Sequence, residues 1–140
     1  MPPVELLHPR TTYPTLRVEE YPDRAEYWMS MHADLGHRPG RACFRPELIG
    51  DILDCQRVLA RRLEIEARNA PGELAHVVLA SCDDSFNLGG DLALFCNAIR
   101  RQDRAGLLDY ARQCVRGVHA FHQGLGGRAH TIALAQGDAL

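Results

Sequence analysis

The sequence has no long apolar run, no clustered cysteine pair and no marked excess of charge of one sign. No stretch approaches the roughly 20 apolar residues that a membrane-spanning helix requires, so we expect no membrane span. The opening MPPVELLHPR contains two early prolines and no apolar segment, which argues against a signal peptide or a lipid anchor. We therefore expect a cytoplasmic protein.

The five cysteines are odd in number, far apart, and never spaced as CxxC or CxxH. This pattern indicates free thiols in a reducing compartment and predicts no metal site. Sixteen basic residues against eighteen acidic ones give a formal charge of -2, without the basic excess that nucleic-acid binding requires. We therefore expect no nucleic-acid partner.

The length and composition are those of a single ordinary globular domain. The chain has 140 residues, of which 46% are hydrophobic and 24% charged. Residues 1–14 contain several prolines and show no periodicity, so we expect a flexible N-terminal lead there. The domain itself is then expected to cover residues 15–140.

The first half of that domain predicts a β-hairpin followed by a long helix. β-Forming residues gather from Thr15 to Glu20 and from Ala25 to Ala33, and a turn signal at Tyr21-Pro22-Asp23 separates them. Pro46 then opens a helical pattern that reaches Asn69, with apolar residues every three or four positions.

The second half predicts a parallel strand–helix–strand unit. His76 to Ser81 is a short β-rich run typical of a strand buried on both faces, and Ala129 to Ala135 is another. Helices are expected between them, from Asp91 to Arg101 and from Ala105 to Gly124, which makes the two strands parallel with a right-handed connection. The chain ends directly after the last strand, where an α/β protein places its functional loop, so we expect an incomplete domain.

The segment Ser85 to Leu92, SFNLGGDL, carries the most informative chemistry. It follows a predicted buried strand and leads into a helix. Paired glycines let the backbone approach a ligand closely, and amides at a helix N-terminus are unpaired donors that can stabilise an oxyanion. Taken alone, however, this local pattern favours a simple tight turn in which Asp91 caps the helix.

The wider pattern resembles the crotonase superfamily, in which a strand is followed by Phe-x-x-Gly-x-Asp-Leu/Ile and then a helix. The resemblance implies that the amide of Gly90 donates one of two hydrogen bonds to the thioester carbonyl. It also implies substrate-binding positions, which are Ala42, Phe86, Leu88, Gly89, Asp91 and Leu92. Gly137-Asp138-Ala139-Leu140 resembles the Gly-x-Ala-Leu that precedes the family's second donor, and Arg41 to Phe44 resembles an Asn-Ala-Leu that lines the nucleotide end of the carrier.

Within the superfamily the chain looks like a bacterial diffusible signal factor synthase from about Thr15 to Leu140. The strings that carry this likeness are Met31 to Leu35, Arg41 to Phe44, Phe86 to Cys96 and Leu108 to His122. The resemblance implies an α/β fold, namely the truncated N-terminal part of a crotonase-type ββα spiral. It also implies a dehydratase and thioesterase that turns a 3-hydroxyacyl thioester into a cis-2-unsaturated fatty acid signal.

The same resemblance implies no cofactor besides the acyl thioester, which is carried by acyl carrier protein or coenzyme A. It implies a homotrimer for the full-length family and a membrane sensor kinase as a further partner. The two catalytic glutamates of the family lie beyond Leu140, so we expect this chain alone to be inactive. The alternative function is a non-catalytic piece that binds an acyl carrier or a partner protein.

Three other features have plainer interpretations. His119 and His122 have a helical spacing that suits two ligands, but no third ligand accompanies them, which favours a surface or partly buried role. Cys82 is followed by two aspartates that would raise its pKa and so suppress the nucleophilic thiolate. The basic cluster Arg100, Arg101 and Arg104 fits either a carrier phosphate or a solvated helix end.

Overall fold

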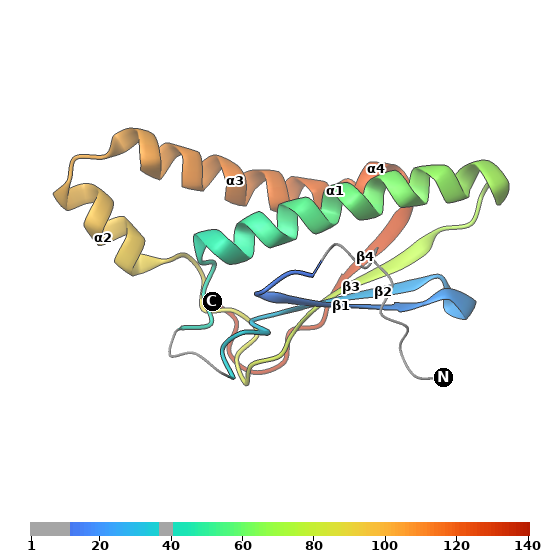
Figure 1. Ribbon diagram of the computed structural model, residues 1–140, viewed down its shortest axis with the longest axis horizontal. Helices are drawn as coiled ribbons and strands as arrows, with labels where there is room; N and C mark the ends of the chain where they lie inside the picture. The colour runs from blue at the N-terminus through green and yellow to red at the C-terminus, as the bar shows by residue number, and fades with distance from the viewer. Residues whose placement is uncertain (1–11, 37–40) are drawn as a thin grey trace.

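The structure is a computed structural model that describes residues 12–36 and 41–140, and in these ranges helices cover one face of a four-stranded sheet (Figure 1). The strand order is β1-β2-β3-β4, with β1 antiparallel to β2 and the other neighbours parallel. The elements in chain order are β1 (Leu16–Tyr21), η1 (Pro22–Arg24), β2 (Glu26–Met31), α1 (Pro46–Asn69), β3 (Ala75–Ser81), α2 (Leu92–Arg100), α3 (Arg104–His122), α4 (Gly124–Gly127) and β4 (Ala129–Ala133).

The predicted hairpin, long helix and parallel unit are confirmed. Leu16 pairs with Met31 and Tyr21 with Glu26, so β1 and β2 are in register over their whole lengths. The α1 helix begins at Pro46, where a missing N–H costs nothing because the first amides of a helix have no partner within it. β3 and β4 are parallel, and α2, α3 and α4 connect them. The predicted burial of the second strand is wrong, because β4 is the edge strand of the described sheet, ends at Ala133 and leaves Ile132 46% exposed.

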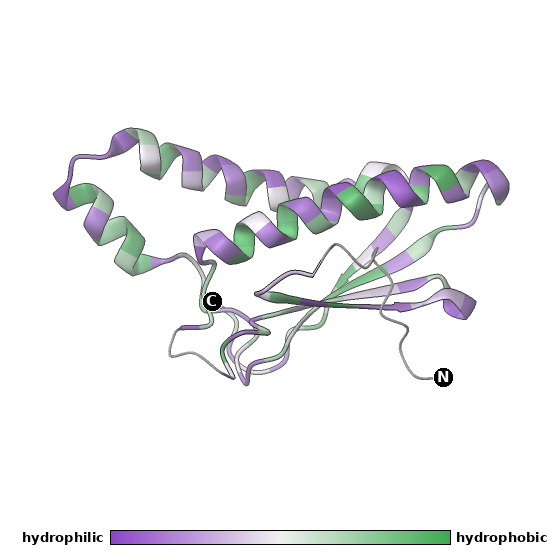
Figure 2. Cartoon of the chain, in the orientation of Figure 1, coloured by the Kyte–Doolittle hydropathy of each residue, from purple (hydrophilic) through white to green (hydrophobic). Residues whose placement is uncertain are grey.

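The core lies between the sheet and α1. Alternate strand residues point toward the helix, as the two-residue period of a strand requires, and among them Met29, Met31 and Val77 have no exposed surface. Figure 2 shows hydrophobic and hydrophilic residues alternating along α1 and α3, as amphipathic helices require. The buried residues of α1 recur every three or four positions: Leu48, Ile49, Ile52, Cys55, Gln56, Leu59 and Leu63.

The α3 helix packs against α1 but leaves an apolar stripe uncovered. Tyr110 is its one buried residue, and Gln56 of α1 donates a hydrogen bond to the carbonyl of Gly117 at 2.9 Å. The helical extent predicted from residues 105–124 is confirmed within two residues. Three of the large apolar residues that predicted it are nevertheless exposed, because α1 does not cover them: Leu108, Val115 and Val118.

The glycines predicted to end this helix do more than stop it. After His122 the chain makes a further four-residue turn, α4, in which Leu125 and Gly126 have positive φ angles of 50° and 81°. Leu125 is 2% exposed and belongs to the core. The turn therefore buries a leucine while it redirects the chain into β4.

Part of the predicted N-terminal lead, residues 1–11, lies outside the described residues. Tyr13 is described, and its hydroxyl donates to Asp54 of α1 at 2.8 Å. In the described ranges, no helix has both the length and the apolarity needed to cross a bilayer.

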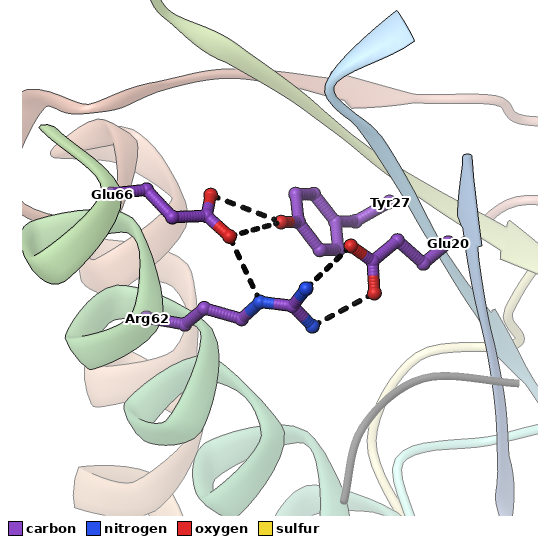
Figure 3. Close-up of polar contacts among 4 residues, drawn as sticks. All are labelled: Glu20, Tyr27, Arg62 and Glu66. Atoms are coloured by element: carbon purple, nitrogen blue, oxygen red, sulfur yellow. Dashed lines mark hydrogen bonds and ion pairs between the residues drawn. The ribbon is translucent and has the colours of Figure 1, made fainter. Parts of the chain in front are cut away.

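A polar network joins β1 and β2 to the C-terminal half of α1 (Figure 3). The guanidinium of Arg62 donates to both oxygens of Glu20, at 2.7 and 2.6 Å, and to Glu66 at 3.0 Å. Tyr27 donates its hydroxyl proton to Glu66, and its ring lies against the guanidinium, 5.6 Å from centroid to carbon. The side chain of Glu20 is only 4% exposed, so its charge depends on Arg62 for compensation.

We expect Glu20→Gln to lower the free energy of unfolding by about 2 kcal/mol, because it leaves a buried guanidinium hydrogen bond unmade. Glu64→Gln is the matched control, since Glu64 pairs with Arg68 at 3.7 Å on the exposed face of α1, the helix that also carries Arg62. The control should change stability by less than about 0.5 kcal/mol. Urea denaturation followed by circular dichroism measures both, and equal midpoints for the two variants would contradict this account of the network.

Candidate functional site

The loop between β3 and α2 crosses the carboxyl-terminal edge of the parallel strands, near the end of the chain (Figure 1). It begins with a tight turn in which the Ser81 hydroxyl donates to the carbonyl of Ser85 at 2.7 Å. The same hydroxyl accepts from the Asp83 amide at 3.0 Å, and Asp83 in turn accepts from the Ser85 amide. The sequence signals for this turn are the small polar residues that favour such local hydrogen bonds.

One side of the loop is held by the segment that precedes α1. The amide of Leu88 donates to the carbonyl of Ala42 at 2.7 Å, and the amide of Phe44 donates to the carbonyl of Gly89 at 2.8 Å. Ala42 is 4% exposed. These two hydrogen bonds place residues 42–44 beside residues 88–90 as a short parallel pair.

The other side is held by the last residues of the chain. The amides of Phe86 and Asn87 donate to the carbonyl of Asp138, at 2.9 and 3.2 Å. The amide of Leu140 donates to the carbonyl of Asn87 at 2.9 Å. The two segments that resemble the family's oxyanion elements, 86–92 and 137–140, are therefore in direct contact.

Three successive amides at the end of the loop differ in their hydrogen bonding. The Gly89 amide donates to Oδ1 of Asn87 at 2.8 Å, and the Asp91 amide donates to the Tyr110 hydroxyl at 3.0 Å. The Gly90 amide between them has no hydrogen-bond partner in the described residues. Because Phe44 and Gly90 form a parallel bridge bonded through the flanking residues, the Gly90 amide points away from Phe44.

Packing against Phe95 favours glycine at position 90. A Cβ placed there would lie 2.8 Å from Cζ of Phe95, a distance that real Cβ contacts do not reach. The Phe95 ring is itself fixed edge-on against Tyr110, with centroids 5.4 Å apart. The preceding Gly89 has a φ of +82°, which favours glycine for conformational reasons instead.

Tyr110 links α3 both to the loop and to the segment before α1 that pairs with it. Its hydroxyl donates to the carbonyl of Phe44 at 2.6 Å while it accepts from the amide of Asp91. Burial is the main reason that the pKa of Tyr110 is raised to about 12, so the hydroxyl stays protonated and keeps donating at neutral pH. This residue is a support that no motif reveals, because it reaches the loop from 19 positions away.

A hollow of about 220 Å³ is lined in part by Gly90. Two cationic side chains, of Arg41 and Arg45, contribute to its wall, although Arg45 is also held by Asp34 through two hydrogen bonds of 2.7 and 2.8 Å. That ion pair is the main reason that the pKa of Arg45 is raised. The hollow is lined by Arg41, Cys43, Arg45, Leu88, Gly90, Asp91, Leu92 and Ala93.

A second, almost wholly apolar hollow of about 100 Å³ lies between α1 and α3. Phe44 is part of its wall, and the same residue forms a parallel bridge with Gly90, which lines the first hollow. Its other lining residues include Ile49, Ile52, Leu79 and Phe121.

The structure brings the predicted site residues together. Ala42 pairs with Leu88, and Gly89 and Gly90 follow in the same turn, while Asp91 caps α2 by accepting from the Leu94 amide at 3.1 Å. Leu92 is the first residue of α2 and is 62% exposed beside the hollow. Phe86 packs against the core. The sequence analysis did not identify three residues whose side chains contact the loop or orient it through hydrogen bonds: His32, Asn87 and Tyr110.

The Cys82 thiol is not activated, although the cause differs from the one predicted. Its pKa is raised mainly by burial, with Glu19 adding to the effect and Arg17 opposing it. The two aspartates that follow Cys82 are not among the causes. All five cysteines are free thiols in this structure.

The other candidate features are separate from the loop. His119 and His122 are both exposed on α3, and within residues 12–36 and 41–140 no three metal-ligating side chains converge. The side chains of Arg100, Arg101 and Arg104 are exposed and form no ion pair with other described residues.

The chain matches no protein-family model and no curated protein sequence. Among solved structures it is similar to an enoyl-CoA hydratase candidate from Streptomyces coelicolor A3(2), with a TM-score of 0.54 and 21% sequence identity. The aligned region covers 95% of this chain and 42% of that protein, so the chain spans less than half of that protein's length. The match shows a mixed α/β arrangement that corresponds to part of a crotonase fold, which confirms the predicted fold class.

We expect Tyr110→Phe to loosen the loop and lower the free energy of unfolding by about 1–2 kcal/mol, because it leaves the Phe44 carbonyl and the Asp91 amide without a partner. Hydrogen exchange of the Asp91 amide should become markedly faster. Tyr21→Phe is the control, since no hydrogen bond of its hydroxyl is found among the described residues. Unchanged exchange at Asp91 in Tyr110→Phe would show that the hydroxyl does not hold this amide.

Proposed function

We propose that this chain supplies one oxyanion-hole donor, the backbone amide of Gly90, to a crotonase-fold enzyme that acts on acyl thioesters. The observation that carries the proposal is the contrast between three successive amides, of which only that of Gly90 lacks a partner in the described residues. Gly90 lines a hollow and lies just before the N-cap of α2, so an acceptor oxygen bound to its N–H would also meet the positive end of the helix dipole.

The chemistry explains why such a donor is needed. Removing a proton next to a thioester builds negative charge on the carbonyl oxygen, and an aimed amide stabilises the charge where it develops. Losing one such donor costs about 3 kcal/mol of barrier. Asp91 is occupied in capping α2, so we assign it no role as a base.

The resemblance to the crotonase superfamily supports a second donor and two catalytic glutamates that follow the segment 137–140 in longer members. That segment already contacts the loop through Leu140 and Asp138. We therefore propose that the reaction requires residues beyond those of this chain, and that the 140 residues by themselves bind the thioester without turning it over.

The finer assignment is a diffusible signal factor synthase, which dehydrates a 3-hydroxyacyl thioester and releases a cis-2-unsaturated fatty acid. Supporting it are the sequence strings that flank the loop, together with an apolar hollow that is lined by Phe44, the bridge partner of Gly90, and that suits an aliphatic chain. The solved neighbour is named for coenzyme A chemistry, so both coenzyme A and acyl carrier protein are proposed carriers. Arg41 at the wall of the polar hollow is suited to a carrier phosphate.

We also propose that the protein associates with copies of itself and with a partner protein. The stripe on α3 formed by Leu108, Val115 and Val118 is exposed at residues spaced as in a helix–helix interface. A surface of this kind supports the trimer that the resemblance implies. The resemblance also implies a membrane sensor kinase as a partner.

The alternative is a non-catalytic piece that binds an acyl carrier or a partner protein. It is favoured by the presence of a thioester-facing loop without an assigned base. This alternative predicts binding of the carrier regardless of the Gly90 amide, and the following comparison separates it from the leading proposal.

The decisive variants are Gly90→Pro and Gly90→Ala, each made with Phe95→Leu so that the new Cβ has room. Both add a Cβ at the same place, but only proline removes the N–H. We expect the proline variant to bind a medium-chain 3-hydroxyacyl-coenzyme A about tenfold more weakly than the alanine variant, as loss of one hydrogen bond to a polar carbonyl implies.

Isothermal titration calorimetry measures the two affinities, and circular dichroism verifies that both variants are folded. Equal affinities would count against an oxyanion role for Gly90 and in favour of the alternative. The absence of binding by the alanine variant and by the unaltered chain would reject the thioester proposal altogether.

A further inference from the structure

Behind the glycine turn lies a buried histidine that the proposed reaction does not use. His32 follows β2 directly, is 1% exposed and has a φ of +62°, a left-handed conformation that few residues other than glycine adopt. Its Nε2 lies 3.3 Å from Nδ2 of Asn87, which is itself 3% exposed. A buried imidazole in a strained conformation beside a loop support calls for a physical explanation.

The hydrogen bonds fix the orientation of the Asn87 amide. The Gly89 N–H can only donate, so the Asn87 atom that meets it at 2.8 Å must be the carbonyl oxygen Oδ1. Nδ2 of Asn87 is then the atom that faces His32. Because this nitrogen can only donate, Nε2 of His32 must be the acceptor.

The protonation state of His32 follows from that direction. An accepting Nε2 carries no proton, so the ring is neutral and its proton is on Nδ1. Nδ1 is buried and has no partner in the described residues. Addition of a second proton would set an N–H of His32 against an N–H of Asn87, and the amide could no longer hold both neighbours.

We propose that neutral His32 is a positioning residue, which orients the side chain of Asn87 and through it the turn that presents the Gly90 amide. The inference rests on the proposed function for the role of Gly90, but its structural half concerns only His32, Asn87 and Gly89. In this arrangement the imidazole contacts neither the thioester nor the reacting atoms.

The charges around His32 agree with a neutral ring. Burial is the main reason that its pKa is lowered from 6.5, and the guanidinium of Arg45, which precedes α1, lowers it further. Asp83 after β3 and Asp34 after β2 oppose that shift, and so does the nearby backbone of Phe86, although neither ring nitrogen is in hydrogen-bonding geometry with it. Since the folded state takes up this proton less readily than the unfolded state, the associated stability is present above pH 6.5 and is lost as the pH falls through the folded pKa.

The matched variants are His32→Gln and His32→Leu. Glutamine can place its Oε1 where Nε2 stands, so it keeps an acceptor that does not titrate, whereas leucine fills similar space without one. Both lack the imidazole and both must adopt the same positive φ, so the loss of the ring and the backbone strain are common to the pair.

The first measurement tests whether His32 orients Asn87 and the turn, and it needs no ligand. Selective ¹⁵N labelling of histidine should show His32 as the neutral tautomer with its proton on Nδ1 at about pH 7.5. As acidification protonates His32, the Gly89 amide resonance should shift in the unaltered chain and stay constant over the same pH range in His32→Gln. A proton on Nε2, or a Gly89 resonance that ignores the state of His32, would overturn the proposal even if thioester binding is found.

The second measurement concerns function. At about pH 7.5 we expect His32→Gln to bind a medium-chain 3-hydroxyacyl-coenzyme A within about twofold of the unaltered chain, and His32→Leu about fivefold to tenfold more weakly. Acidification should weaken binding by the unaltered chain but not by His32→Gln. Equal weakening in both variants, without a difference in pH profile, would mean that His32 only fills space, whereas no binding by any of the three chains would reject the thioester function and leave the first measurement valid.

Discussion

The arrangement of the loop between β3 and α2 depends on one constraint, which is that backbone amides taken out of water need hydrogen-bond partners. On one side, the amides of Leu88 and Phe44 donate hydrogen bonds between the loop and the segment that precedes α1. On the other side, the amide of Leu140 and the carbonyl of Asp138 form hydrogen bonds with the loop. Asn87 and Tyr110 then take the amides on either side of Gly90. The neighbouring amides are thus occupied, whereas the N–H of Gly90 has no partner among the described residues.

The remainder of the fold keeps those supports in place. Tyr110 comes from α3, which is held against α1 by the Gln56 hydrogen bond, and α1 is packed on the sheet through Leu48, Ile52 and Leu59. The polar network of Glu20 and Arg62 attaches the other end of α1 to the hairpin. The position of the Gly90 amide thus depends on contacts that extend across the sheet and both long helices.

Much of this architecture could be predicted from sequence, because it depends on local signals. The Pro46 start, the three- and four-residue spacing in α1, and the β-rich run before Cys82 each act within a few residues, and the elements that they predicted are confirmed. The Gly89-Gly90-Asp91 turn was also recognisable, since a helix cap and two glycines are adjacent in the chain. The site residues inferred from the resemblance cluster in space, and their roles in binding stay predictions.

What the sequence did not reveal depends on long-range contacts. Tyr110 was one aromatic residue in a helical pattern, and only the packing of α3 shows that its hydroxyl meets the Asp91 amide. His32 gave no periodic signal, because its meaning depends on Asn87, 55 positions away. The exposed Val115 and Val118 show the opposite error, since apolar spacing predicted the helix correctly but could not say which apolar positions α1 would cover.

The most direct test of the open amide is hydrogen exchange in a ¹⁵N-glycine-labelled chain, with the Gly89 and Gly90 resonances assigned and followed before and after addition of a medium-chain acyl-coenzyme A. The account predicts that Gly89 exchanges slowly throughout, whereas Gly90 exchanges fast in the free chain and becomes protected, with a downfield proton shift, when the thioester binds. A Gly90 amide that is already protected without ligand, or that is unaffected by saturating thioester, would contradict it.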